Sequence, residues 1–241
     1  QRVYFAVRDE EWLNIEHTVK DFESEFSDLT TTYSYDLIFK NDKVDFTSEL
    51  TIKIEDNKLV IEATGKASSD FMKNRIGLCI HLPSALKGTP CHVSHTDHTS
   101  SSTELPLLVS PHQPVKNISQ FELRFDQFSA KIDFEGDIFE MEDQRNWTDA
   151  SYKIYSTPLE LPFPVEVKKG DLFHQKISIT VLSEVHAAES HMKVQNSEGQ
   201  LLPSPLLGTM IPDNLSTEVM DYFLQHSNFP FSFLRIDFRL Y

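Results

Sequence analysis

The chain has 241 residues, of which 39% are hydrophobic and 24% charged, a composition typical of globular proteins that excludes an extended disordered chain. Its formal net charge of −15 argues against nucleic acid and against an anionic membrane surface as partners, because both require a basic surface. No apolar run approaches the roughly 18 residues of a spanning helix, so we expect no membrane insertion. The two cysteines, Cys79 and Cys91, could pair but are too few for a disulfide framework. We therefore expect a cytoplasmic protein.

The first third of the chain has the alternating pattern of consecutive antiparallel strands. Asn41-Asp42 and Asp56-Asn57 are suited to tight hairpin turns between them. Because one face of these strands is apolar, we predict a sheet with one buried face. The predicted strands cover residues 2–8, 17–26, 31–39, 43–54 and 58–67.

The middle of the chain continues the sheet. The run from Ile76 to Leu82 is apolar on both faces except at His81, which predicts a central strand. The segment from His92 to His98 holds four potential metal ligands, but it matches no metal-binding motif, so we predict no metal site there. Asp97–Ser100 resembles a hairpin tip. Further strands are predicted over 121–125, 130–136 and 171–184, and a stiff crossover between sheets at Pro158, Pro162 and Pro164.

One stretch breaks this pattern. Read at period two from Phe139, one face takes Met141, Asp143, Arg145 and Trp147, and beyond Asp143 both faces are polar. Charges of both signs at this density are costly to bury unless they pair with each other or with a ligand. The stretch is therefore either a solvated strand end with surface ion pairs or a site that faces a ligand.

The end of the chain differs in kind. Residues 186–200 are polar and predict an exposed loop. Ser216 can cap a helix with an apolar stripe that includes Val219 and Phe223, and residues 231–241 then predict a strand. We interpret residues 1–212 as one β domain. Residues 213–241 are interpreted as a linker helix and the first strand of a following α/β barrel that is missing here, with the chain trimmed at both ends.

Five segments resemble bacterial D-apionate lactonases. These are Arg2–Asp9, Phe71–Cys79, Ser110–Pro114, Phe233–Arg239 and, most specifically, the fifteen residues Phe139–Lys153. The resemblance implies an all-β fold, a large antiparallel β-sandwich similar to the galactose mutarotase supersandwich, followed by a TIM-type barrel and a C-terminal β domain. It also implies a reaction, the opening of D-apionolactone to D-apionate in apiose catabolism.

Lactone hydrolysis needs a base that activates water and a cationic or hydrogen-bonding group for the oxyanion. In the stretch that breaks the pattern, a carboxylate could act as the base that activates water, and a cation could stabilise the oxyanion. The same groups would equally suit a sugar-binding site, with Trp147 as a flat apolar face. We take as candidate catalytic residues Glu140, Glu142, Asp143 and Arg145, and as candidate substrate-binding residues Asn74, Arg75, His112, Asn146, Trp147, Asp149 and Lys153.

Three hypotheses follow. The first is the N-terminal domain of a sugar-lactone hydrolase that needs its barrel for activity, with a carbohydrate or lactone as ligand and without a cofactor. The second is a non-catalytic sandwich that binds carbohydrate or braces the barrel, in which case the ion pairs would be closed and buried. The third is a mutarotase-like epimerase, in which His81 or His112 would be the general acid.

Overall fold

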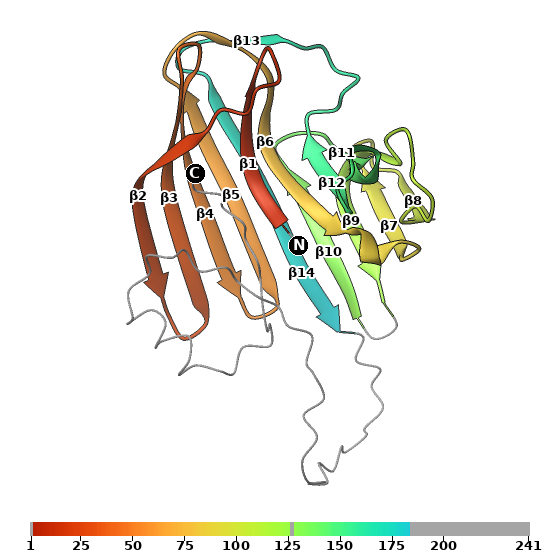
Figure 1. Ribbon diagram of the computed structural model, residues 1–241. Coiled ribbons are helices and arrows are strands. Elements are labelled where there is room, and N and C mark those ends of the chain that lie inside the picture. The colour runs from red at the N-terminus through yellow and green to blue at the C-terminus, as the bar shows by residue number, and fades with distance from the viewer. Residues whose placement is uncertain (1, 126–127, 184–241) are drawn as a thin grey trace.

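The computed structural model describes residues 2–125 and 128–183, and within these ranges fourteen strands form one antiparallel sheet (Figure 1). The strands predicted from sequence are confirmed, with boundaries shifted by a few residues. The predicted loop at 186–200, helix at Ser216 and strand at 231–241 lie outside the described residues. The strands are β1 (Arg2–Asp9), β2 (His17–Phe26), β3 (Thr30–Lys40), β4 (Asp45–Glu55), β5 (Lys58–Ala67), β6 (Phe71–Pro83), β7 (Pro90–His95), β8 (Ser100–Glu104), β9 (Val115–Arg124), β10 (Phe128–Glu135), β11 (Phe139–Asp143), β12 (Ser151–Ser156), β13 (Val165–Val167) and β14 (Leu172–Ser183).

The sheet folds back over itself into two layers. Its main path runs β1-β6-β12-β11-β9-β10-β14-β5-β4-β3-β2. The first layer contains β1, β6, β12 and β11, and the second contains β10, β14, β5, β4, β3 and β2. The ring of Phe5 on β1 lies 5.7 Å from that of Phe39 on β3 and 6.3 Å from that of Phe46 on β4, which places the layers face to face (Figure 1). The predicted antiparallel β-sandwich is confirmed.

The core lies between the layers because most strands turn an apolar face inward. On β1 the residues Val3, Phe5 and Val7 point inward and are buried. The predicted central strand β6 is buried along most of its length, and it pairs with β1 on one side and with β12 on the other. Burial of each large apolar side chain contributes about 1.5–3 kcal/mol, so a core of this size is the main source of stability.

The layers approach closely where Gln175 on β14 reaches across to β6. Its Oε1 accepts a hydrogen bond from the backbone N–H of Leu78 at 2.8 Å, and its Nε2 donates to Ser156 Oγ at 2.9 Å. Gly77 makes this approach possible, because a Cβ there would lie 2.1 Å from Ser156 Oγ and 2.6 Å from Gln175 Oε1. Gln175 thus satisfies a backbone donor of the first layer from the second.

The stretch that broke the sequence pattern forms two elements. Strand β11 ends at Asp143, and a 3₁₀ turn, η2 (Gln144–Trp147), follows it and ends at Thr148 in the left-handed region with φ 65°. The period-two alternation therefore applies only up to Asp143. The strand stops there because the Asp143 carboxylate accepts a hydrogen bond from the backbone N–H of Arg145 at 3.1 Å and caps the turn.

A second short turn, η1 (Ser84–Leu86), follows β6. The expected hairpin tip at residues 97–100 is confirmed, since β7 and β8 pair on either side of it. Strand β7 ends at His95, so His92 lies on the strand and His98 lies in the turn, which keeps these two potential ligands apart. The proline-rich segment after β12 leads to β13 and then to β14, and so carries the chain from the first layer to the second.

Candidate functional site

The outward face of the first layer carries two rows of polar side chains that run across four adjacent strands. The strand registers place each residue directly opposite the next, and neighbouring Cβ atoms in such rows are about 5 Å apart. We call this set the polar face. Its first row is Glu142 (β11), Lys153 (β12), His81 (β6) and Arg2 (β1), and its second row is Glu140, Tyr155, Cys79 and Tyr4.

The first row is centred on an ion pair. Lys153 Nζ lies 3.3 Å from Glu142 Oε2, and both side chains are largely but not completely buried. Trp147 Nε1 donates to Glu142 Oε1 at 3.1 Å, and Gln144 Nε2 donates to Oε2 at 2.7 Å. Three donors thus face this carboxylate, so Glu142 is arranged as a fixed acceptor of hydrogen bonds.

The second row is more deeply buried. Glu140 Oε1 accepts hydrogen bonds from the Tyr155 hydroxyl at 2.6 Å and from the backbone N–H of Leu159 at 2.7 Å. Burial, and then the hydrogen bond to Glu140, raise the pKa of Tyr155, which keeps the phenol protonated as a donor. Burial likewise raises the pKa values of Tyr4 and of the Cys79 thiol.

His81 joins the two rows. Its Nδ1 lies 2.9 Å from Ser151 Oγ and 3.8 Å from Asp149 Oδ2, and its Nε2 lies 3.4 Å from the Tyr4 hydroxyl. Burial, and then the charge of Lys153, lower the pKa of His81 to about 4. At neutral pH this imidazole is therefore uncharged and serves as a hydrogen-bonding group, which does not suit the general-acid role of the epimerase hypothesis.

The predicted residues Asp143, Arg145 and Asn146 lie on the other side of β11 and form a unit that we call the loop clamp. The Asp143 carboxylate is fully buried and accepts hydrogen bonds from Arg145 Nε at 2.9 Å and Nη2 at 2.7 Å. It also accepts from the backbone N–H of Ser110 at 2.9 Å. Burial raises the pKa of Asp143, but the hydrogen bonds from Arg145 and Ser110 outweigh it and lower that pKa below its ordinary value.

The clamp holds the segment before β9, residues 106–110. Arg145 donates to the backbone carbonyl oxygens of Pro106 at 2.8 Å, Leu107 at 3.2 Å and Leu108 at 3.1 Å, and Asn146 Nδ2 donates to that of Ser110 at 2.5 Å. The guanidinium also lies over the ring of Tyr152 at 4.8 Å. The hydrogen-bonding capacity of these side chains is thus directed at the protein itself.

Asn74 and Arg75 lie toward the other end of β6. Asn74 Nδ2 donates to the backbone carbonyl of Glu10 at 3.0 Å. Arg75 donates to the carbonyl of Pro158 at 2.9 Å, and its guanidinium lies 5.3 Å from the ring centre of Trp12 and 5.1 Å from that of Phe163. His112 is exposed in the segment between β8 and β9, where its carbonyl accepts a hydrogen bond from Ser110 Oγ at 2.8 Å.

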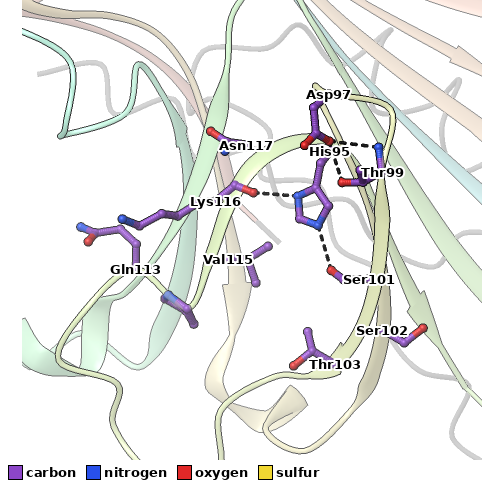
Figure 2. A pocket seen from close by; sticks show the side chains of 11 residues that line it. His95, Asp97, Thr99, Ser101, Ser102, Thr103, Gln113, Val115, Lys116 and Asn117 are labelled. Carbon is purple, nitrogen blue, oxygen red and sulfur yellow. Dashed lines mark hydrogen bonds between the residues drawn. The ribbon is translucent and has the colours of Figure 1, made fainter.

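An open hollow of about 500 Å³ lies beside the β7–β8 hairpin (Figure 2). His95 Nδ1 lies 2.9 Å from the carbonyl oxygen of Lys116, which can only accept, so Nδ1 carries the hydrogen. In the neutral ring, Nε2 then accepts from Ser101 Oγ at 2.8 Å. With Gln113 and the neighbouring hydroxyls of Ser102 and Thr103, the hollow offers donors and acceptors that suit a polyol.

Within residues 2–125 and 128–183, no group of three or more His, Cys, Asp or Glu side chains is placed to hold a metal ion. Cys79 and Cys91 are both buried free thiols. In the same part of the chain, no helix is long and apolar enough to span a bilayer.

The structure brings Glu140, Glu142 and Lys153 together, with Trp147 beside them and Asp149 near His81. Sequence reasoning missed Arg2, Tyr4, Cys79 and Tyr155 as their neighbours. The polar positions of β1 were visible in its alternation, but the order of strands in the sheet was not. Gln113 and Lys116 were missed as well, because the loop before β9, which carries Gln113 and leads directly to Lys116, has no pattern.

The comparisons with known proteins place the chain. The sequence profile of the family described as D-apionate lactonase, N-terminal domain, matches residues 1–184. A D-apionate lactonase of Brucella anthropi is 34% identical over 190 residues, which cover 77% of this chain and 31% of that protein. The chain therefore spans less than a third of the length of this relative.

Solved structures give weaker likenesses. A GH36 α-galactosidase from Geobacillus stearothermophilus has a TM-score of 0.48 at 11% identity, covering 73% of this chain and 29% of that one. A galactose mutarotase-like protein from Lactobacillus casei has a TM-score of 0.46 at 11% identity, covering 74% and 84%. A putative aldose 1-epimerase from Escherichia coli K12 has a TM-score of 0.42 at 10% identity, covering 76% and 84%.

The profile match covers most of the chain, and the identity to the Brucella protein extends over nearly the same length. The chain belongs to the D-apionate lactonase family and contains its N-terminal domain.

Proposed function

We propose that this chain is the N-terminal domain of a cytoplasmic bacterial enzyme that opens D-apionolactone to D-apionate in apiose catabolism. The observation that carries the proposal is the 34% identity to a D-apionate lactonase over 190 residues. The reaction belongs to the full-length protein, because the chain covers 31% of that relative.

Within this domain, we propose that the polar face takes part in binding the lactone or its product. Glu142 and Lys153 lie side by side across β11 and β12, and each keeps part of its surface exposed. A carboxylate accepts hydrogen bonds from sugar hydroxyls, and an ammonium stabilises negative charge on a carbonyl oxygen or on the carboxylate product. Trp147, which is bound to Glu142, offers an apolar face for the C–H groups of the sugar.

The other predicted catalytic residues are proposed to act by positioning. Glu140 holds Tyr155 and the backbone of Leu159, and Asp143 with Arg145 holds residues 106–110. Their hydrogen bonds orient the elements that carry Glu142, Lys153 and Trp147.

The test uses the full-length enzyme and measures proton release at constant pH from a panel of pentono- and apionolactones. The test variants are Glu142→Gln and Lys153→Met, and the control is Lys131→Met. Lys131 lies on β10 in the second layer and forms an outward ion pair with Asp133 at 3.3 Å, the same distance as between Lys153 and Glu142. We expect kcat/KM to fall 10³-fold or more, about 4 kcal/mol of transition-state stabilisation, for at least one polar-face variant and to stay unchanged for Lys131→Met. Unchanged rates in both polar-face variants would reject the assignment of this face, and absence of hydrolysis by the wild type would reject the reaction.

The hollow beside the β7–β8 hairpin favours a second candidate function, non-catalytic carbohydrate binding by this domain. It combines the His95–Ser101 pair with an amide and several hydroxyls in about 500 Å³. A calorimetric titration of the full-length protein with D-apionate should then show heat of binding. The substitution His95→Ala should abolish this heat and leave kcat unchanged. Equal binding by wild type and His95→Ala would reject it.

A further inference from the structure

The segment held by the loop clamp presents consecutive apolar side chains to solvent. Leu107 is 62% exposed, Leu108 84% and Val109 49%. The Leu107 side chain packs against the backbone at Gly88, since a Cβ added to Gly88 would lie 2.9 Å from Leu107 Cδ2. We call the three residues Leu107, Leu108 and Val109 the apolar shelf. Together they expose roughly 300 Å² of mainly apolar surface, a size comparable to the largest apolar patch of a typical monomer, and such patches are often functional.

The shelf is held rigidly. Arg145 binds the carbonyls of Pro106, Leu107 and Leu108, while Asp143 binds the N–H of Ser110 and Asn146 binds its carbonyl. The Tyr152 hydroxyl adds a further hydrogen bond to the Pro106 carbonyl at 2.7 Å. Because the backbone polar groups of this segment are turned toward the clamp, the side chains of Leu108 and Val109 are left pointing away from it.

Burying an Asp–Arg pair usually gives little net stability, so the structure keeps a costly feature to hold an otherwise irregular segment in place. A preformed apolar surface binds a partner at lower entropic cost than a mobile one, because less conformational freedom is lost on docking. The rigidity of the shelf therefore points to an occupant.

We propose that the apolar shelf is the surface on which the remainder of the full-length polypeptide docks. The related D-apionate lactonase is more than three times as long as the region matched here, so the full-length protein has ample chain to cover it. Separate molecules that associate stably bury about 800 Å² on each partner, which is more than the shelf provides. Covalent linkage removes this requirement by supplying an effective concentration in the millimolar range.

Charge argues the same way. A second copy of this chain would bring another net charge of −15 to the interface, and the two copies would repel. The inference rests on membership of the family and not on the lactone chemistry proposed above, so either can fail without the other.

The test labels a cysteine placed on the shelf in the full-length enzyme. Leu108→Cys is compared with Leu29→Cys, because both leucines are 84% exposed and Leu29 lies at the β2–β3 turn, away from the clamp. The native Cys79 and Cys91 are buried. Labelling by a maleimide is followed by peptide mass spectrometry, with the activity of each variant measured in parallel.

We expect Leu108→Cys to react at least tenfold more slowly than Leu29→Cys in the full-length enzyme, and at a similar rate in the 241-residue chain. Similar rates in the full-length enzyme, or slow reaction at both positions, would overturn the proposal. Slow reaction at Leu108→Cys that becomes fast on dilution would assign the shelf to a second copy and overturn it as well. If Leu108→Cys is labelled slowly but the full-length enzyme does not hydrolyse lactones, the docking proposal stands and the lactone proposal fails.

Discussion

At the scale of single residues, the charged side chains that break the sequence pattern are used in two different ways. Glu142 and Lys153 form a partly exposed pair on the polar face, whereas Asp143 and Arg145 form a buried pair whose hydrogen bonds are taken up by the backbone. Alternation along β11 decides between these fates, because Glu142 points outward and Asp143 points to the core side.

Arg145→Met should destabilise the folded chain strongly, because it leaves the carboxylate of Asp143 buried without its cation. Loss of one partner of such a pair costs about 3–5 kcal/mol, and urea unfolding measures it. Asp143→Asn combined with Arg145→Met should cost clearly less than the sum of the single changes. A loss below about 1 kcal/mol for Arg145→Met would contradict the role of the clamp.

His81 should make stability depend on pH between 4 and 6.5. Its folded-state pKa of about 4 lies below the ordinary value of 6.5, so the unfolded chain binds the proton more readily in this window. The contribution of the neutral imidazole is therefore complete above pH 6.5 and is lost as the pH falls toward 4, by up to about 3 kcal/mol. His81→Gln should flatten this part of the curve of unfolding free energy against pH, and an unchanged slope would rule the effect out.

Asp143 should add a second dependence of stability on pH, at a lower pH than that of His81. Because its folded-state pKa is lowered, its contribution is present above the unfolded pKa near 4 and is lost as the pH falls through the folded value. The two residues can thus be distinguished by the pH range in which each substitution acts.

At the scale of elements, β6 holds the two layers together. It pairs with β1 and β12 within its own layer, and its Leu78 N–H is satisfied by Gln175 from the opposite layer. Backbone donors inside a sandwich must find partners, and here the partner is a side chain.

Gln175→Met should therefore destabilise the fold by about 1–3 kcal/mol, since it keeps the volume but leaves the Leu78 N–H buried without an acceptor. Thermal or urea unfolding gives the value. His174→Met, at a more exposed neighbouring position on β14 that carries a surface contact to Glu62, is the matched control and should cost much less. Equal effects of the two changes would contradict the bridging role.

At the scale of the whole molecule, the polar face and the apolar shelf lie on opposite sides of the same stretch, β11 and η2. One side offers hydrogen-bonding groups that suit a sugar, and the other holds an apolar surface in place. This arrangement is what a domain needs if it both borders a ligand and packs against the rest of an enzyme.

The 241-residue chain on its own should not turn over lactones. In the full-length relative, the sequence outside the matched region is more than twice as long as the matched region itself. Proton-release assays of the chain and of the full-length enzyme under the same conditions test this. Turnover by the chain at more than about a hundredth of the full-length rate would show that the catalytic groups are complete within it.

The amino-acid sequence by itself determined the antiparallel strands, their Asn- and Asp-based turns and the membership of the family. These features are local, since alternation and turn chemistry depend on neighbouring residues. It also pointed to Phe139–Lys153 as the unusual stretch, because mixed charges there conflict with burial.

The tertiary structure alone decided what that stretch does. The rows of the polar face join β1, β6, β12 and β11, which are separated by up to about 150 positions in the chain, and local patterns carry no information on such pairings. The clamp likewise joins residues 143–146 to residues 106–110. Only the order and register of the strands place Glu142 beside Lys153 and turn Arg145 toward the loop, because a shift of one residue along β11 would exchange the two faces.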